Sequence, residues 1–426
     1  MSEVPFKIRW LSGGVPDHWQ IVEPRRIFKL VKEPERPGDV HLTPSQKYGV
    51  LPQEEYMKIT GARVVQNLSG TQMQHVEPGD FISHLRTFQG GLELATIPGK
   101  VSPAYTVLRP TEAVYPGFFK HVLKSPGYVS QIASVTDQLR DGQTMRFNEF
   151  NLTWLPLPPL EEQKRIADEL DRELAEIDEF IADQRRLQDL LQERLVSLTF
   201  DLATDASNPD RYETGHLFWK TLPKGWTLQK LGWHFRIGNG STPSTENPDF
   251  WTDEDTGFPW FNSSIVNSDV ALEPARFVTD KAIRECHLPF VSKDSLLVGL
   301  TGQGKNRGMV TKTGIDATIN QHMAFLTPRK NSQLDVDFTN LTLTAAYPEL
   351  RLLSDGNGGT KGALTCDELK HFMIPTLPKN IQLQKNDYYF KSAMKINKIQ
   401  NEIGKSIIYL NQKQKSFTLT LINQYR

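Results

Sequence analysis

One loop of this 426-residue chain carries residue types that could hold a phosphate group. Gly299, Gly304 and Lys305 have the spacing of the phosphate-binding loop Gly-x-x-x-x-Gly-Lys-Ser/Thr. Asn306 stands where that pattern needs a hydroxyl group to bind a magnesium ion. Residues 307–310 then return to an extended pattern instead of opening a helix. The sequence therefore predicts a polar tip that contacts phosphates or bases.

Other segments come close to catalytic motifs without completing one. Residues 247–250, Asn-Pro-Asp-Phe, lack the second proline of the Asn-Pro-Pro-aromatic tetrapeptide of amino-methyltransferases. Residues 238–243, Gly-Asn-Gly-Ser-Thr-Pro, lack the third glycine of a dinucleotide-binding loop. The 10 histidines show no metal-binding spacing such as His-Glu-x-x-His, and there is no Gly-x-Ser-x-Gly elbow. We predict no catalytic residue, no metal site and no cofactor, which indicates a protein that works by binding.

Two loops, at 83–91 and 301–307, combine basic, amide and glycine residues at matching places of an internal repeat. Arg, Gln and Asn can read base edges through paired hydrogen bonds, and glycine lets the backbone approach a duplex closely. The residues predicted to contact DNA are Arg86, Gln89, Gly90, Ser241, Thr242, Gln303, Lys305, Asn306 and Arg307. An ordinary polar hairpin tip is the alternative for each loop.

The repeat itself fixes the order of the elements that carry these loops. Pro156 and Gln163 return as Pro375 and Gln382, and a Pro-rich stretch opens a long helical segment in both copies. Each copy is preceded by a globule of mixed pattern. The strand candidates are 81–85, 105–108 and 151–154 in the first globule and 295–300, 309–311 and 322–326 in the second. The expected fold is α+β, with two similar mixed α/β globules separated by two long antiparallel, coiled-coil-like helices.

Each helical segment carries one apolar stripe. From Glu161 to Leu202, apolar residues recur every three or four positions, and a less regular stripe runs from Tyr389 to Leu421. A helix of this length cannot bury its stripe alone, so we predict that the two helices pack against each other. The residues expected in helix pairing and subunit docking are Ile166, Leu170, Ile177, Ile181, Leu191, Ile396, Ile399 and Leu410.

The charge of the chain is distributed unevenly over four predicted segments: globules at 1–155 and 206–374, and long helices at 156–205 and 375–426. The first helix holds 6 Lys+Arg and 14 Asp+Glu, and the second holds 9 and 2, so their net charges are −8 and +7. The globules are close to neutral. Opposite charges on flanking positions select a helix partner, although two solvated faces that differ by chance are the alternative.

Cysteine use and hydropathy indicate the compartment. Cys286 and Cys366 are too few for a disulfide framework or a zinc site, which fits a reducing cytoplasm. No run approaches 18 apolar residues, and the first ten residues lack the pattern of a signal peptide. We expect a cytoplasmic protein without a membrane segment.

With these features, the chain resembles the specificity subunit of type I restriction-modification systems over essentially its full length. The order of several matching stretches, together with the internal repeat, carries the resemblance. These stretches are Val15–Trp19, Leu155–Gln163, Ile177-Asp178, Leu222–Trp226, Gly238–Pro243, Pro259-Trp260 and Ala317–Gln321.

The resemblance implies two target-recognition domains, each reading one half of a split site in double-stranded DNA, and helices that set the gap. It also implies docking of two modification (methyltransferase) subunits, and restriction subunits in a full complex that serves host defence. S-adenosylmethionine, ATP and magnesium would belong to those partners, which leaves this chain non-catalytic. One departure is Lys379–Gln382 in place of Leu160–Gln163, which puts the second docking surface in doubt.

Two other functions remain as alternatives. The first is an adaptor, in which two globules on a helical hairpin bind proteins rather than DNA. The near-neutral globules favour it, since most DNA readers are basic, and salt-dependent binding to a duplex would separate it from the DNA-binding function. The second is an NTP-binding enzyme that uses Gly299–Asn306, which a nucleotide-binding assay would reveal.

Overall fold

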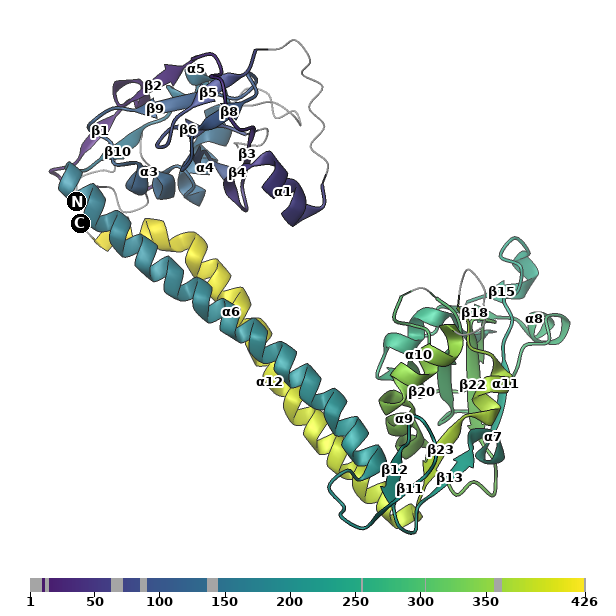
Figure 1. Cartoon of the computed structure of the whole chain (residues 1–426). Helices are drawn as coiled ribbons and strands as arrows, with labels where there is room; N and C mark the ends of the chain where they lie inside the picture. The colour runs from purple at the N-terminus through teal and green to yellow at the C-terminus, as the bar shows by residue number, and fades with distance from the viewer. Residues whose placement is uncertain are drawn as a thin grey trace. The chain divides into compact units, whose positions relative to one another are not determined.

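The computed structural model describes residues 10–11, 15–62, 72–84, 90–135, 145–253, 256–302, 304–355 and 362–424. The chain divides into two compact units (Figure 1). Unit 1 comprises Met1–Arg185 and Ile403–Arg426, and unit 2 comprises Arg186–Glu402. Each unit contains a mixed α/β globule and a part of both long helices. The predicted α+β class with two long helices is therefore confirmed.

Unit 1 is built on an antiparallel four-stranded sheet with the order β2-β9-β6-β7, beside the ladders β1-β10, β3-β4 and β5-β8. Its strands are β1 (Gln20–Val22), β2 (Phe28–Val31), β3 (Leu42–Ser45), β4 (Gly49–Pro52), β5 (Gln74–Val76), β6 (Phe81–Ile82), β7 (Glu93–Leu94), β8 (Gly99–Val101), β9 (Val107–Pro110) and β10 (Leu155–Leu157). Its short helices are η2 (Pro24–Arg26), α1 (Gln53–Thr60), α3 (Pro116–Val122), α4 (Pro126–Val135) and α5 (Phe147–Phe150).

The core of unit 1 is aromatic and includes the start of the first long helix, α6 (Leu160–Thr204). Phe28 on β2 meets three further phenylalanines edge to face, with ring centroids 5.5–5.7 Å apart. Ile166 and Leu170 of α6 are fully buried in the same cluster. Burial of apolar area is the main stabilising term in folding, so the first turns of α6 are part of the globule.

A buried glutamine fastens α6 to this globule. The Gln163 side chain is fully buried. Its Oε1 accepts a hydrogen bond from the backbone nitrogen of Tyr115 at 2.7 Å, and its Nε2 donates to the carbonyl oxygens of Ala113 and Pro158 at 2.9 Å. The amide thus satisfies three backbone groups that would otherwise be left unpaired where the helix enters the globule.

Unit 2 contains a five-stranded sheet with the order β14-β22-β19-β20-β17 and a four-stranded sheet with the order β15-β18-β16-β21. Its strands are β11 (Arg211–Glu213), β12 (Thr221–Pro223), β13 (Thr227–Lys230), β14 (Phe235–Asn239), β15 (Trp251–Thr252), β16 (Phe258–Phe261), β17 (Val270–Ala271), β18 (Arg276–Val278), β19 (Leu296–Gly299), β20 (Val310–Thr313), β21 (Thr318–Ile319), β22 (Met323–Pro328) and β23 (Met373–Thr376). Its short helices are α7 (Leu231–His234), η3 (Pro248–Phe250), η5 (Ser263–Asn267), α8 (Asp280–Glu285), α9 (Val336–Ala345), α10 (Tyr347–Asp355) and α11 (Cys366–His371).

The second long helix, α12 (Lys379–Gln424), is fastened to unit 2 by the counterpart of Gln163. The Gln382 side chain is also fully buried. Its Oε1 accepts from the backbone nitrogen of Asp335 at 2.8 Å, and its Nε2 donates to the carbonyl oxygens of Gln333 and Leu377 at 2.9 and 2.7 Å. The strand before each long helix is β10 in unit 1 and β23 in unit 2. Both pair antiparallel with an earlier strand of their own globule, β10 with β1 and β23 with β13. The repeat seen in the sequence is therefore a repeat of the fold.

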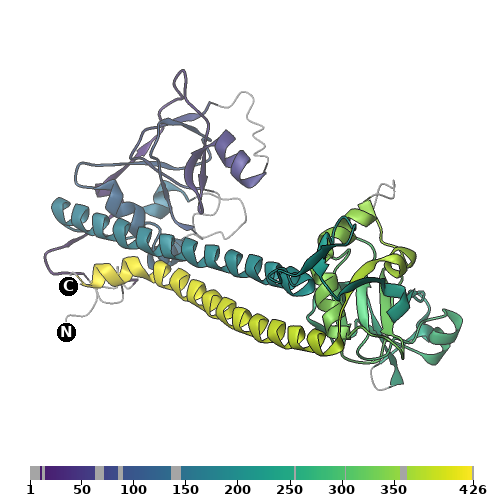
Figure 2. The same ribbon diagram turned by 60° about the horizontal axis from the view of Figure 1, so that its bottom comes forward.

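The two long helices run side by side and antiparallel within each unit (Figure 1 and Figure 2). In unit 1, Gln414 Nε2 near the end of α12 donates to Asp178 Oδ1 in the first half of α6 at 2.9 Å. In unit 2, Lys385 Nζ near the start of α12 lies 2.8 Å from Asp205 Oδ1, just beyond the end of α6. The predicted antiparallel pairing is confirmed, and contacts of this kind place the basic helix against the acidic one.

Burial along the helices follows the predicted stripe with one exception. Ile177, Ile181 and Ile396 are buried, and Leu191 and Leu410 are half-buried. Ile399, in contrast, is 45% exposed and Ile403 is 6% exposed. The buried stripe of α12 passes through Ile396 and Ile403 and leaves Ile399 at its edge, so of the two roles predicted for Ile399 its exposure suits subunit docking, which stays a prediction.

Candidate nucleic-acid interface

The glycine- and lysine-containing loop of unit 2 is the tip of a hairpin between β19 and β20. Its neck is closed by Gly308 N donating to Gly299 O at 2.8 Å and Gly299 N donating to Met309 O at 3.0 Å. A strand, not a helix, follows the loop. A phosphate-binding loop owes its strength to the amide groups and dipole of a following helix, so this hairpin lacks the main element of an NTP site.

One face of α10 holds this loop in place. Tyr347, Arg351 and Asp355 follow one another at four-residue intervals, so their side chains lie along one side of the helix. The Tyr347 hydroxyl donates to Lys305 O at 2.9 Å, and Arg351 Nη1 donates to Gly304 O at 2.7 Å. Because its backbone is held at two points, the loop presents its side chains in a fixed arrangement.

Of the four basic and amide residues predicted to read DNA in this loop, the three that the structure describes have different surroundings. Lys305 is exposed and Asn306 is half-buried, with its Oδ1 accepting from Asn267 Nδ2 at 3.1 Å. Arg307 is only 5% exposed, and its guanidinium group pairs with Asp355 at 2.5 Å. Arg307 is therefore removed from the set of base-reading residues, because a buried cation paired with a carboxylate cannot reach a duplex. It holds the loop against α10 instead.

A chain of polar side chains joins three separate segments of unit 2. The Thr242 hydroxyl donates to Gln321 Oε1 at 2.5 Å, and Gln321 Nε2 lies 3.3 Å from His322 Nε2. His322 Nδ1 is 2.9 Å from the Thr301 hydroxyl, at the start of the hairpin loop. Thr242, Gln321 and His322 are exposed. We call Thr242, Thr301, Gln321 and His322 the polar edge of unit 2.

Close backbone packing brings Thr242 to this edge. Ser241 N donates to Ile319 O at 3.0 Å, and Ser241 O accepts from Trp260 Nε1 at 3.2 Å. A Cβ atom on Gly240 would overlap the carbonyl oxygen of Ile319, so only glycine lets the two segments lie this close. Ser241 acts through its backbone, whereas Thr242 offers a hydroxyl group.

The polar edge has the chemistry needed to read base edges. Amide, imidazole and hydroxyl groups can each donate and accept hydrogen bonds, and the exposed Lys305, in the same hairpin loop as Thr301, can contact a phosphate. Gln321 stood in the sequence only as the end of a stretch that matches the family, and His322 carried no signal of its own. Their partners are 79 and 21 positions away, and no local pattern reveals such distances.

In unit 1, the predicted residues Arg86 and Gln89 lie outside the described residues, as does Gln303 in unit 2. Gly90 is described and half-buried. A Cβ atom at this position would clash with the Gln46 side chain, so the glycine allows a close approach within the protein itself. A contact between Gly90 and DNA stays a prediction.

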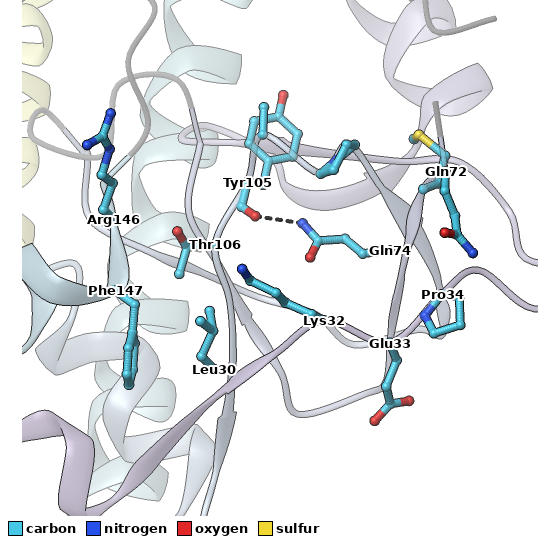
Figure 3. Close-up of a pocket in the computed structure, with 13 residues that line it drawn as sticks. Leu30, Lys32, Glu33, Pro34, Gln72, Gln74, Tyr105, Thr106, Arg146 and Phe147 are labelled. Carbon is cyan, nitrogen blue, oxygen red and sulfur yellow. Dashed lines mark hydrogen bonds between the residues drawn. The ribbon is translucent and has the colours of Figure 1, made fainter. Parts of the chain in front are cut away.

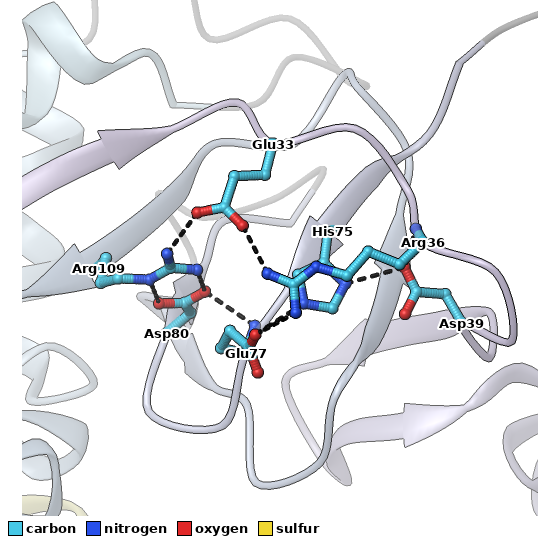
Figure 4. A network of polar contacts seen from close by, with 7 residues as sticks. All are labelled: Glu33, Arg36, Asp39, His75, Glu77, Asp80 and Arg109. Atoms are coloured by element: carbon cyan, nitrogen blue, oxygen red, sulfur yellow. Dashed lines mark hydrogen bonds and ion pairs between the residues drawn. The ribbon is translucent and has the colours of Figure 1, made fainter.

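Charged side chains of unit 1 form a self-contained network (Figure 4). Arg109 binds Asp80 through two hydrogen bonds of 2.9 Å and Glu33 through one of 2.5 Å. Arg36 lies 2.9 Å from Glu33. The remaining members are Asp39, His75 and Glu77. These groups pair with one another, so the network ties β5 and β9 to the segment that follows β2.

His75 is the titratable group at the centre of one side of this network. It is 2% exposed, with Nδ1 2.8 Å from Asp39 and Nε2 3.1 Å from Glu77. Burial alone lowers the pKa of an imidazole, but the hydrogen bonds to Asp39 and Glu77 outweigh it and raise the pKa of His75 above its ordinary value of 6.5. The two carboxylates thus favour the charged form of the imidazole.

Among the described residues, no three His, Cys, Asp or Glu side chains are placed to hold a metal ion. No helix in the described part of the chain is long and apolar enough to cross a membrane.

Residues 223–409 match the family model described as "Type I restriction modification DNA specificity domain". Two curated relatives carry the same kind of name. The EcoKI specificity subunit of Escherichia coli K12 is 39% identical over 72 residues, and the MjaIX specificity subunit of Methanocaldococcus jannaschii is 25% identical over 206 residues. In these comparisons the chain is similar to the specificity subunits of type I restriction-modification systems.

The matches to these two type I specificity subunits are partial. They cover 17% and 44% of this chain, and 15% and 42% of the relatives' own lengths. The fold match is broader. A chain from a type I restriction-modification structure aligns with a TM-score of 0.71 at 18% identity, covering 97% of this chain and 99% of its own length. The HsdS subunit of Thermoanaerobacter tengcongensis aligns with a TM-score of 0.61 at 17% identity over 100% of both chains.

Proposed function

We propose that this chain is the non-catalytic, DNA-reading subunit of a type I restriction-modification complex. Each globule reads one half of a bipartite target in double-stranded DNA, and the helix pair sets the gap between the halves. The observation that carries the proposal is the repeated fastening of a globule to a long helix, by Gln163 in unit 1 and by Gln382 in unit 2. Two globules of the same fold, each attached to its own long helix, suit a DNA target with two halves.

The helix pair also offers surface for the modification subunits. On the part of α6 and α12 in unit 2, large apolar side chains are exposed: Leu187, Leu190, Val196, Leu383, Tyr388, Phe390, Met394 and Ile399. So many exposed large apolar side chains on one helix pair suit contact with a partner. Such partners would supply S-adenosylmethionine binding, catalysis and much of the grip on phosphates, which accounts for globules with little net charge.

The test is methylation of a randomised site library by the assembled complex. Gln321→Ala and His322→Ala remove two members of the polar edge, and we expect each to change base preference in one half-site while the other half-site stays the same. A good bidentate contact discriminates between bases by about 1–3 kcal/mol, so the change should be about tenfold or more at the affected position. Glu285→Ala, on an exposed position of α8, serves as the matched control.

Two results would count against the proposal. Unchanged preference in both variants would mean that the polar edge faces away from DNA. A wild-type complex whose preference does not depend on this chain would instead favour the protein-binding adaptor.

A further inference from the structure

A pocket of about 580 Å³ opens on unit 1 (Figure 3). Gln74 and Thr106 are buried at its floor, and Lys32 and Arg146 are exposed at its mouth. Phe147 adds an aromatic wall. The pocket therefore has both apolar and polar side chains in its interior, and two cations at its entrance.

The floor of the pocket presents hydrogen-bond acceptors. Gln74 Nε2 donates to the carbonyl oxygens of Ser102 and Tyr105 at 2.9 and 2.6 Å, which fixes the amide so that its oxygen is the group left to accept. The Thr106 hydroxyl donates its hydrogen to Met145 O at 2.6 Å and keeps lone pairs for a further donor. A ligand that suits this floor must bring N–H groups.

The mouth of the pocket is positive. Lys32 points into the same space as Gln74, whereas the Glu33 carboxylate points away from it (Figure 3). Glu33 is bound to Arg109 and Arg36, and these cations lower its pKa below the ordinary value. Lys32 and Arg146 form no ion pair with another residue of the described ranges. The charge available to a ligand is therefore that of the two cations.

Strand register shows where this pocket lies in the repeat. In unit 1, β2 pairs with β9 so that Phe28 faces Pro110, and in unit 2, β14 pairs with β22 so that Phe235 faces Pro328. Pro103 and Ala104 line the pocket and lie seven and six positions before Pro110. Gln321 and His322 of the polar edge lie seven and six positions before Pro328, so the two pairs of residues correspond. Counting forward from the two phenylalanines matches Pro34 with Ser241. The pocket of unit 1 thus occupies the place in the fold that the polar edge occupies in unit 2.

We propose that this pocket binds one nucleotide of the half-site that unit 1 reads. Lys32 and Arg146 hold the phosphate, and the acceptors of Gln74 and Thr106 receive an exocyclic amino group, which adenine and cytosine bear and thymine lacks. The inference rests on the proposed DNA-reading function. It goes beyond that function in giving unit 1 a reading site built differently from the one in unit 2, with a recessed floor in place of projecting amide and imidazole groups.

Two variants test the proposal in the assembled complex without removing the buried amide. Ala104→Trp fills the mouth from an exposed position and should lower methylation of the preferred half-site about tenfold while leaving the other half-site unchanged. Lys32→Ala combined with Arg146→Ala should weaken DNA binding alike for all sequences, and should reduce the slope of log affinity against log salt by about one, because one phosphate contact is lost. Ala62→Trp, on an exposed position at the end of α1, is the control for bulk, and thermal unfolding checks the fold of each variant.

The outcomes separate this proposal from the one on which it rests. If the wild-type complex shows no split target, the DNA-reading function fails and the pocket proposal fails with it. If the wild type reads a split target and both pocket variants match it in preference and salt slope, only the pocket proposal is overturned. A free nucleotide is the alternative ligand of the pocket. Titration of the full chain with dAMP and ATP tests whether the pocket binds one. Binding that Ala104→Trp abolishes would make the pocket an effector site and would overturn its role as a DNA contact.

Discussion

Gln163 and Gln382 occupy equivalent positions in the two units, and each uses one buried amide to satisfy three backbone groups. Both lie in the first turn of a long helix, after a strand that pairs with the start of its globule. The amide therefore couples the direction of each helix to its own globule.

Replacing either glutamine by alanine should destabilise the protein. The change leaves two carbonyl oxygens and one backbone N–H buried without partners, and we expect a loss of about 2–4 kcal/mol in the free energy of unfolding. Denaturant unfolding of Gln163→Ala and Gln382→Ala would measure this. Gln192→Ala, on an exposed position of α6, should cost less than about 0.5 kcal/mol. Equal stability of all three variants would show that the buried amides carry no such role.

The ion pair between Lys385 and Asp205 should make stability depend on acid pH. Burial opposes the charged form of Asp205, but hydrogen bonds from Lys385 and Asn208 outweigh it and lower the pKa of this carboxyl group below its ordinary value of 3.8. A lowered folded-state pKa gives stability that is present above the unfolded pKa and is lost as the pH falls through the folded value. We therefore expect this contribution to disappear below about pH 4.

Asp205→Asn is the variant that tests this pH dependence. Asp205 has a positive φ of 50°, which asparagine tolerates better than most residues, so the backbone is not strained by the change. The variant should lose about 1–3 kcal/mol at neutral pH and show a weaker dependence on pH between about 2 and 5. Parallel stability curves for the variant and the wild type would contradict the assigned role of the pair.

His75 should contribute a dependence of opposite sign. Its folded-state pKa is raised above 6.5, so the stability it adds is complete below the unfolded pKa and is lost as the pH rises through the folded value. We expect the melting temperature of the wild type to fall from pH 6.5 upward more steeply than that of His75→Gln. The chemical shift of the His75 ring protons should report the raised pKa directly, and a value below 6.5 would refute the assignment.

Lengthening both helices tests whether they set the gap. Insertion of seven residues after Arg185 in α6 and seven after Glu402 in α12 keeps each apolar stripe almost in register, because seven residues are close to two helical turns. The insertion adds about 10 Å of helix, the length of about three base pairs. The two half-sites should stay the same while the gap in the methylated motif grows. Altered half-sites with the original gap would exclude a spacing role for the helices.

The parts of the fold that could be predicted from the sequence are those that follow a local periodicity of apolar residues or an internal repeat. The stripe from Ile166 onward predicted α6, and the apolar runs at 295–300 and 322–326 predicted β19 and β22. The predicted strand at 151–154 is wrong. The Thr153 hydroxyl accepts a hydrogen bond from Tyr128 and donates one to Phe150 O, which holds these residues in a turn. The strand therefore starts only at Leu155.

The site was predicted less well, because its formation depends on contacts between distant segments. Arg307 has the side chain of a base reader, but Asp355 lies 48 positions later and draws it into the protein. Gln321 and His322 become site residues only through contact with Thr242 and Thr301. The pocket of unit 1 likewise draws Lys32, Gln74 and Arg146 from three separate segments.

Methylome sequencing of cells that contain the partner subunits, with and without this gene, tests the central claim most directly. Two globules that each read a half-site predict a split motif, two short specific sequences with an unspecified gap between them, that is methylated only when the gene is present. Identical methylomes in the two strains, or a continuous motif without a gap, would contradict it.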